Sequence, residues 1–232
     1  MMRRLLACLA RDLKVQYRAR YVLTALLALV VWAAAMRMVS EAGAYVMAPA
    51  FLFLNTFLLS FSLGLRQATS EKHTGVLAAL DASPLRPHEY LAARAVSLTL
   101  IAGAQNLALA IAGGKQIASY MALLGGVCSE SILLSLFAFL VTAYTRPGNV
   151  VLARIVASGM LLVPPLLPFF GYAPGSWLIL HPLQGPLVLL QGAFFRLPGT
   201  TVAMSLAGSA AWAMLLLAAC RPAMGRVRRE GC

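Results

Sequence analysis

The sequence is short of acidic residues and of charge in general. Only 7 of its 232 residues are Asp or Glu, against 19 Lys or Arg, and charged residues of both signs make up 11% of the chain. Soluble domains contain about 25% charged and about 45–50% apolar residues, whereas 61% of this chain is apolar. The composition therefore excludes an ordinary soluble domain and predicts a protein that crosses a membrane several times.

Cysteine and histidine are few and scattered. The four cysteines show no CxxC or other metal-ligand spacing, and the three histidines, His73, His88 and His181, do not form a cluster in the sequence. A zinc site needs clustered ligands, and an intramembrane protease needs a nucleophile and a base within reach of each other. The sequence offers neither, so we expect no metal site, no resident cofactor and no catalytic residue.

Six apolar runs are long enough to span a membrane, and the basic residues lie almost entirely on one side of them. The expected spans are residues 21–38, 45–65, 91–112, 117–143, 150–170 and 200–220. With both termini inside, 16 of the 19 Lys and Arg residues fall on the inner side, and only Arg37, Lys115 and Arg196 fall outside. Because Lys and Arg near span ends are retained in the cytoplasm, this asymmetry predicts the topology.

The net charge of +12 does not indicate a nucleic-acid partner. The basic residues sit at span ends, where they contact anionic membrane lipid. Residues 1–20 fit this interpretation, because on a helical wheel their leucines and Tyr17 fill one arc and their basic residues fill the opposite arc. This pattern predicts an interfacial amphipathic helix on the inner leaflet, with a disordered basic tail as the alternative.

The inner segment between the second and third spans is the most specific stretch of the sequence. Glu71–Leu80 can form a short helix with one apolar face. Pro84 disfavours helix at Ser83, which predicts a turn. Tyr90 and Arg94 then stand where the third span enters the membrane, as residues of an interfacial anchor do.

The motif in this segment, Glu-x3-Gly-x4-Leu-x2-Ser-Pro-Leu-x4-Tyr-Leu-x2-Arg, resembles the inner loop of ABC-2 type transporter permeases. Within that family the chain is most similar to the short permeases for fluoroquinolone-type drug export. The resemblance covers residues 1–232 as a single transmembrane domain, and it implies that the inner loop, residues 66–90, is a coupling helix that docks on a separate ATP-binding-cassette ATPase. The coupling residues implied are Glu71, Gly75, Leu77, Leu80, Ser83, Pro84 and Leu85.

Residues 171–199, before the last span, combine prolines with apolar runs too short to cross the membrane. Trp177–Leu180 and Leu187–Phe195 are two such runs. Short apolar segments of this kind suit a re-entrant hairpin buried against protein at membrane depth. The resemblance implies the same arrangement, in which paired external helices cap the exit side. A flexible external loop is the alternative.

Polar residues inside the predicted spans are candidates for a transport pathway. Glu130 stands near the middle of the fourth span, where a carboxyl is costly unless it faces a partner or water. Asn55 on the second span and Gln105 and Asn106 on the third could line a cavity. All four could instead hydrogen-bond within the helix bundle and hold it together.

The chain has no nucleotide site of its own. Gly113–Gln116 lacks the earlier glycine of a phosphate-binding loop and the Ser or Thr that follows its lysine. We therefore expect ATP and Mg²⁺ on a partner ATPase subunit, and the resemblance implies a second permease, identical or closely related. The predicted protein is an all-α permease in the cell membrane of a prokaryote that exports a hydrophobic or lipid-like small molecule. The alternatives are an ATPase-independent secondary transporter that uses Glu130 and a membrane scaffold that transports nothing.

Overall fold

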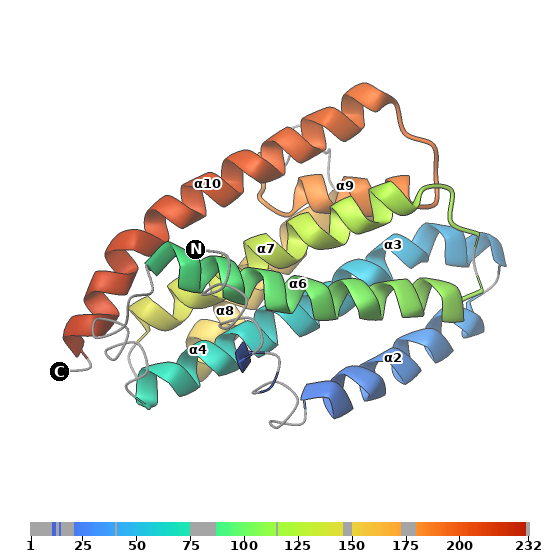
Figure 1. The fold of residues 1–232 in the computed structure, drawn as a ribbon. Helices are drawn as coiled ribbons and strands as arrows, with labels where there is room; N and C mark the ends of the chain where they lie inside the picture. Colours follow the sequence, from blue (N-terminus) through green and yellow to red (C-terminus); the bar gives the residue numbers. More distant parts are fainter. Residues whose placement is uncertain are drawn as a thin grey trace.

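The computed structural model describes residues 11, 12, 14, 21–39, 41–74, 87–114, 116–145, 150–172 and 180–230. These residues form helices joined by short turns and contain no strand (Figure 1). The helices are α2 Tyr21–Met38, α3 Glu41–Phe57, η1 Leu58–Ser62, α4 Leu63–His73, α6 Pro87–Ala112, α7 Tyr120–Tyr144, α8 Val150–Phe169, α9 Gln184–Gly192 and α10 Gly199–Glu230. The all-α prediction is confirmed for this part of the chain.

Five helical segments are long and apolar enough to cross a membrane. They correspond to the second through sixth expected spans: Val46–His73, His88–Ala112, Tyr120–Tyr144, Leu152–Phe169 and Gly199–Val227. The first expected span is the helix α2, but its apolar portion, Ala25–Met38, is shorter than these five. The crossing of the membrane by α2 therefore stays a prediction.

The second expected span is longer than its apolar pattern suggested. The chain stays helical from Glu41 through α3, the π-helical turn η1 and α4 to His73. Pro49 lies in the interior of α3. Glu71 lies in the last turns of α4, so the helix expected at Glu71–Leu80 does not begin at Glu71, and residues 75–80 lie outside the described residues. The polar residues that follow Leu65 continue the helix beyond the apolar run.

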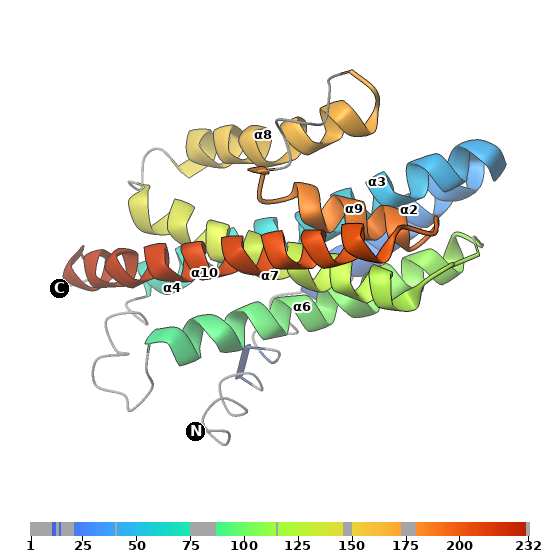
Figure 2. The same cartoon turned by 90° about the horizontal axis from the view of Figure 1, so that it is seen from above.

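Helix α7 is the centre of the bundle. It contacts α3, η1, α4, α6, α8, α9 and α10. The Ser119 side chain caps its first turn by accepting a hydrogen bond from the Ala122 N–H at 3.2 Å, which satisfies one free donor of the helix end. The preceding connection turns at Gly114, whose φ of +69° favours glycine. This left-handed turn lets α6 and α7 pack side by side as an antiparallel pair (Figures 1 and 2).

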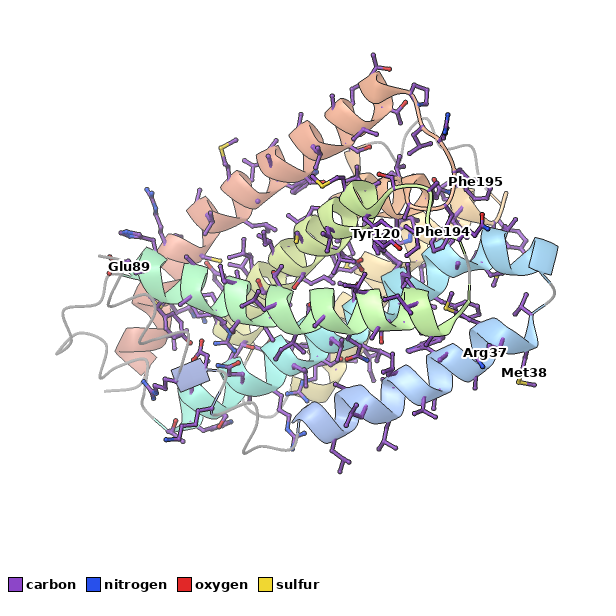
Figure 3. The ribbon with its side chains drawn as sticks, turned by 45° about the vertical axis from the view of Figure 1, so that its right-hand side comes forward. Arg37, Met38, Glu89, Tyr120, Phe194 and Phe195 are labelled. Carbon is purple, nitrogen blue, oxygen red and sulfur yellow. The ribbon has the colours of Figure 1, made fainter. Side chains whose placement is uncertain are left out.

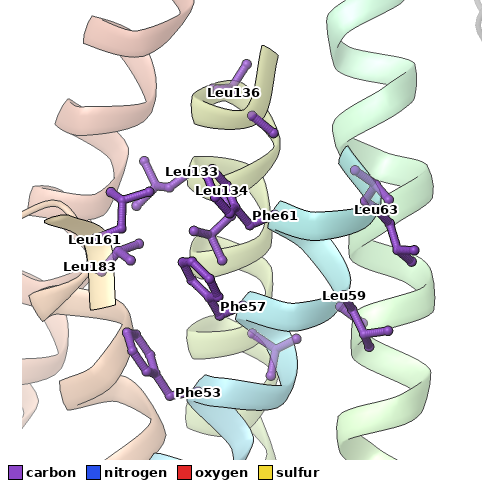
Figure 4. Packing of buried hydrophobic residues seen from close by; sticks show 14 of the residues in the cluster. Phe53, Phe57, Leu59, Phe61, Leu63, Leu133, Leu134, Leu136, Leu161 and Leu183 are labelled. Carbon is purple, nitrogen blue, oxygen red and sulfur yellow. The ribbon is translucent and has the colours of Figure 1, made fainter. Parts of the chain in front are cut away.

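The core is a set of aromatic and leucine side chains between α3, η1 and α7. Phe53, Phe57 and Phe61 stack along one side, and the rings of Phe57 and Phe61 are 5.0 Å apart. Leu133 and Leu134 of α7 close against them (Figure 4). Because lipid tails are as apolar as these side chains, close packing between helices holds such a core together in a membrane.

Labelled side chains mark the two ends of the bundle. Arg37, Met38, Tyr120 and Phe195 gather at one end and Glu89 lies at the other (Figure 3). Exposed aromatic residues are typical of a membrane–water boundary, and the Tyr120 and Phe195 side chains are exposed. Arg37 also donates through Nε to the Ala112 carbonyl at 2.9 Å, which ties the ends of α2 and α6 together.

Helix α8 stands apart from the other helices (Figure 2). Only 11% of the apolar segment of α8 is buried, and only 17% of that of α10, whereas 56% of the apolar segment of α7 is buried. Leu161 of α8 is buried in the core, and Ala157, Leu162, Leu166 and Phe169 pack against the core partly buried. Both α8 and α10 therefore present long apolar faces to whatever surrounds the chain.

Residues 180–192 lie deep against α10. The Leu180 carbonyl accepts a hydrogen bond from Trp212 Nε1 at 2.9 Å, and Trp212 stands 13 residues after the start of α10 at Gly199, about 20 Å along the helix axis. From this depth α9 runs back between α7 and α10 toward the end of the bundle that holds Phe195 (Figure 1). Residues 173–179, which include Trp177, lie outside the described residues.

Candidate functional site

A buried cluster of amide side chains joins three helices near the middle of the bundle. Asn55 Nδ2 donates to Asn106 Oδ1 at 3.2 Å, and Gln105 Nε2 donates to Asn55 Oδ1 at 3.2 Å. Gln105 Nε2 also donates to the Ala25 carbonyl of α2 at 2.8 Å. Three of the four pathway candidates from the sequence therefore lie together, and in this chain they hydrogen-bond to one another across α2, α3 and α6.

A second group of hydroxyls lies at the π-helical turn η1. Ser60 Oγ donates to Ser131 Oγ of α7 at 2.8 Å, and Thr99 Oγ1 of α6 donates to the same oxygen at 3.2 Å. Single π-helical turns within an α-helix frequently mark functional positions. Neither the π turn nor the link through Ser60 has a signal in the sequence pattern.

Glu130 lies on α7 and is fully buried. Neither carboxyl oxygen has a hydrogen-bond partner among the described residues. Thr56 of α3 lies beside the carboxyl, but its hydroxyl donates to the Leu52 carbonyl at 2.9 Å. A buried polar group without a partner costs about 1–3 kcal/mol. The fourth pathway candidate thus differs from the other three, since its polar atoms are not used in holding the helices together.

A buried ionic cluster lies where α4 ends and α6 begins. Arg94 Nη1 donates to Glu71 Oε2 at 2.7 Å and to the Tyr90 hydroxyl at 2.8 Å. Arg94 Nη2 donates to the Gly64 carbonyl at 2.8 Å, and the Tyr90 hydroxyl donates to Glu71 Oε2. The Arg94 side chain is 2% exposed, so the expectation that Tyr90 and Arg94 anchor α6 at the membrane surface is wrong. They hold α6 against α4.

Asp12 adds the N-terminal segment to this cluster. The side chain of Asp12 is buried, whereas Arg11 and Lys14 are exposed. Burial, reinforced by the charge of Glu71, raises the pKa of the Asp12 carboxyl to about 6, against the opposing effect of Arg94, Arg11 and a hydrogen bond with Gln67. The other residues of the predicted interfacial helix, 1–20, lie outside the described residues.

The implied coupling residues other than Glu71 lie outside the described residues. These are Gly75, Leu77, Leu80, Ser83, Pro84 and Leu85. Glu71 itself is half-buried and bonded to Tyr90 and Arg94. The two helices that bracket residues 75–86 are thereby joined by an ion pair at the base of that segment. Sequence reasoning did not connect Arg94 to Glu71, although both belong to the same motif.

Two grooves flank α9. One, of about 580 Å³, runs between α7, α9 and α10 and is lined by Ala122, Cys128 and Arg196 among others. The other, of about 520 Å³, lies between α9 and α10 and is lined by His181, Met204 and Trp212 among others. Both are mainly apolar, as sites for hydrophobic ligands are.

His181 holds the turn before α9. The Leu183 N–H donates to His181 Nδ1 at 3.2 Å, so Nδ1 carries no proton in this arrangement. Nε2 lies 3.3 Å from the Met160 carbonyl of α8 and is then the protonated nitrogen. His181 therefore connects α8 to the segment 180–183 rather than serving as a ligand, and among the described residues no group of three His, Cys, Asp or Glu side chains is placed to hold a metal ion.

The apolar helices and the polar groups buried between them define a multi-pass membrane protein. The chain belongs to the fluoroquinolones export permease protein family, which it matches over residues 3–227.

The curated relatives support the same assignment. The fluoroquinolones export permease protein of Mycobacterium tuberculosis strain CDC 1551 / Oshkosh is 27% identical to this chain over 196 residues, which cover 83% of this chain and 82% of the relative. The protein of the same name from Mycobacterium tuberculosis strain ATCC 25618 / H37Rv has the same identity and coverage. No solved structure matches the chain.

Proposed function

We propose that this chain is the membrane subunit of an ABC-2 type, ATP-driven exporter that moves a hydrophobic or lipid-like small molecule out of the cell. The observation that carries the proposal is the family match over residues 3–227. The relatives are named as fluoroquinolone exporters, so fluoroquinolone-type drugs are the first compounds to test as substrates of this chain. The mainly apolar grooves beside α9 fit cargo of this kind.

ATP hydrolysis in this proposal belongs to a separate ATP-binding-cassette subunit that holds ATP and Mg²⁺. The residues proposed to dock on it are Glu71, Gly75, Leu77, Leu80, Ser83, Pro84 and Leu85. The buried bonds from Glu71 to Tyr90 and Arg94 support this role, because a displacement of residues 75–86 is passed to α4 and α6 through a rigid ion pair instead of being absorbed by a loose connection.

We further propose that two permease chains, identical or related, form the pathway in the cell membrane of a prokaryote. Six spans, α2 included, would place both termini in the cytoplasm, and residues 171–199 would enter the membrane from outside and return. The depth of Leu180 beside Trp212 supports the re-entrant path. The wide apolar faces of α8 and α10 provide surface for the second chain as well as for lipid.

Within each chain we propose separate roles for the polar candidates. Asn55, Gln105 and Asn106 keep α2, α3 and α6 in register through their mutual hydrogen bonds. Glu130 interacts with the cargo in this proposal. Its carboxyl oxygens have no partner among the described residues, so a hydrogen-bond donor of the cargo, or a proton, would satisfy them.

One observation favours a second candidate function. A buried carboxyl without a hydrogen-bond partner is also what a proton-coupled secondary transporter needs, since protonation and release at Glu130 could drive transport without an ATPase. The two functions differ in their energy source. Dissipation of the proton gradient stops the secondary transporter and leaves an ATP-driven exporter active.

Purification of the chain from its native membrane tests the proposed function. We expect an ATP-binding-cassette ATPase to co-purify with the chain in a fixed ratio, and the complex to hydrolyse ATP faster when drug is added. Gly75→Leu should abolish co-purification while membrane insertion stays normal, with Gly103→Leu as a matched glycine control because no atom lies within 4 Å of its Cβ position. Wild-type chain that purifies without an ATPase and still transports would contradict the proposal.

Accessibility of introduced cysteines tests the topology. Reagents applied from outside should reach residues 37–44 and 113–119 and part of residues 171–200, and reagents confined to the inside should reach both termini and residues 71–87. Labelling of residues 71–87 from outside would exclude both the six-span arrangement and the coupling role.

A further inference from the structure

The groove between α7, α9 and α10 is apolar except for two side chains. Its volume of about 580 Å³ lies within the range of about 300–1,000 Å³ that is typical of sites for drug-sized ligands. Among the described residues that line it, Arg196 is the one charged residue and Ser119 the one residue with a hydroxyl. The groove therefore offers a ligand a long apolar surface and two polar contacts.

The two polar side chains lie at the same end of the groove. The Ala193 carbonyl, just after α9, accepts hydrogen bonds from the N–H groups of Ala118 at 2.7 Å and Ser119 at 3.2 Å. Arg196 follows Ala193 by three residues. Cys128 lines the groove nine residues after Ser119 on α7, about 14 Å further along the helix axis. The groove is thus polar at one end and apolar over the rest of its length.

Both polar side chains are hydrogen-bond donors without an acceptor in the described part of the chain. The Arg196 side chain is exposed, and none of the described side chains that line the groove is acidic. The Ser119 hydroxyl accepts a hydrogen bond from the Ala122 N–H at 3.2 Å, which leaves its own proton to donate. Arginine binds a carboxylate through two parallel hydrogen bonds. This end of the groove is therefore suited to an anionic group of a ligand.

The polar end of the groove lies at a membrane–water boundary. Tyr120 and Phe195, the direct sequence neighbours of the two donor residues, are exposed and gather at one end of the bundle (Figure 3). Exposed aromatic side chains are typical of this boundary. Leu124 and Leu206, which line the groove, are 41% and 45% exposed, so the groove is open at the surface of the bundle. A ligand can keep its charged group at the boundary and its apolar body inside the hydrocarbon layer.

We propose that this groove binds a drug-sized amphipathic carboxylate. The carboxylate accepts hydrogen bonds from the Arg196 guanidinium and the Ser119 hydroxyl, and the apolar body lies between α7 and α10 toward Cys128. The groove serves as the outer site from which cargo leaves the membrane. This last role rests on the proposed export function, whereas the binding of the carboxylate does not depend on it.

The binding of pyrenebutyrate to the purified full chain tests this proposal. Pyrenebutanol has the same apolar body with a hydroxyl in place of the carboxylate and serves for comparison. Energy transfer from the tryptophans of the chain to the pyrene measures binding in detergent. Each variant is compared with the wild type for the same probe, so that partition of the probe into micelles cancels.

Substitution of Arg196 should separate the two probes. Arg196→Gln should weaken the binding of pyrenebutyrate about tenfold, because it removes charge-assisted hydrogen bonds, and should leave the binding of pyrenebutanol unchanged. Arg196→Lys should be intermediate, because it keeps the charge and loses the two-pronged contact. Arg37→Gln is the matched control, since it removes the same charge at the same end of the bundle and does not line the groove. Equal binding of pyrenebutyrate by Arg196→Gln and Arg37→Gln would overturn the proposal.

Substitution of Gly125 tests whether the apolar body lies in the groove. A Cβ at Gly125 would have only Leu206 Cδ2 within 4 Å, at 3.8 Å. Gly125→Ala should therefore bind both probes like the wild type, whereas Gly125→Leu should fill the groove and weaken the binding of both. Wild-type binding by Gly125→Leu would place the ligand elsewhere. Circular dichroism and gel filtration check that each variant folds.

Two other occupants of the groove give different results. Displacement of pyrenebutyrate by dioleoyl phosphatidylglycerol, but not by dioleoyl phosphatidylcholine, would assign the groove to an anionic lipid and overturn the proposal. A dimer that excludes both probes, with binding only to the monomer, would assign it to a second copy of the chain. These assays contain no ATPase, so their outcome is independent of ATP-driven export. If the wild type exports and Arg196→Gln exports carboxylates at the same rate, the groove is not the outer site for cargo.

Discussion

Arg94 donates a 2.7 Å hydrogen bond to Glu71 across the base of the inner segment, from a side chain that is 2% exposed to one that is 15% exposed. The two residues are 23 positions apart and belong to α6 and α4. A charge at this depth is tolerated because Glu71, Tyr90 and the Gly64 carbonyl satisfy it together. The pair defines the distance between the two helices that bracket residues 75–86.

Glu71→Gln should destabilise the chain by about 3 kcal/mol, because it leaves the buried Arg94 charge without its counter-ion. Thermal unfolding in detergent measures the loss, with the exposed Lys14→Gln as the control. The double variant Glu71→Met with Arg94→Met should recover most of the stability, since both charges are gone, but it should not recover drug-stimulated ATP hydrolysis. A double variant that restores both would show that the pair has no role in coupling.

The buried carboxyl of Asp12 should make the stability of the folded chain depend on pH. Its pKa is raised to about 6, mainly by burial, so the folded protein binds this proton more tightly than the unfolded chain does. Protonated Asp12 therefore contributes to the free energy of unfolding, by about 3 kcal/mol at most. This contribution is fully present below about pH 4 and is lost as the pH rises through 6. Asp12→Asn should melt at a higher temperature than the wild type at pH 7.5 and at a similar temperature near pH 4.5. Parallel pH curves for the two proteins would contradict the buried position of Asp12.

Substitutions of Glu130 should have opposite effects on the stability of the chain and on transport. Because neither oxygen has a partner among the described residues, Glu130→Met should raise the melting temperature, through the loss of an unsatisfied polar group worth about 1–3 kcal/mol. Export of cationic compounds should fall in the same variant. Glu130→Gln keeps the size but not the exchangeable proton, so we expect export to fall there also. Wild-type export by Glu130→Gln across differently charged compounds would remove Glu130 from the pathway.

Gly185 lets α9 approach α10 closely. A Cβ at this position would lie 2.7 Å from the Ser205 carbonyl oxygen and 2.8 Å from Ser209 Oγ, and the carbonyl cannot move without its helix. Gly185→Ala should therefore push the two helices apart and cost about 1–3 kcal/mol. Gly208→Ala on α10 is the control, because a Cβ at Gly208 would have no atom within 4 Å. Equal melting temperatures for the two variants would mean that α9 does not pack as described.

The helices and their approximate limits could be predicted from the sequence, because long apolar runs bounded by basic residues and turn residues have few other solutions. The expected spans 91–112, 117–143 and 150–170 agree with α6, α7 and α8 to within a few residues. The end of α4 could not be predicted in this way. Leu65 ends the apolar run, but the polar residues up to His73 stay helical because Glu71 and Gln67 have partners on neighbouring elements.

The candidate site was only partly accessible to sequence reasoning. Asn55, Gln105 and Asn106 could be selected as polar residues within apolar spans, but that they bond to one another depends on how three helices rotate about their axes. Arg94 was misread as a surface anchor because position relative to a span end does not tell which face of the helix a residue occupies. The π turn at Ser60 arises from packing and leaves no signature in the residue order.

Drug efflux from proteoliposomes that contain this chain and its proposed ATPase partner tests the proposed function most directly. We predict that a fluoroquinolone is exported when ATP and Mg²⁺ are present, that export persists when the proton gradient is collapsed, and that it stops when the ATPase subunit is omitted. Export by this chain alone, driven by a proton gradient without ATP, would contradict the account.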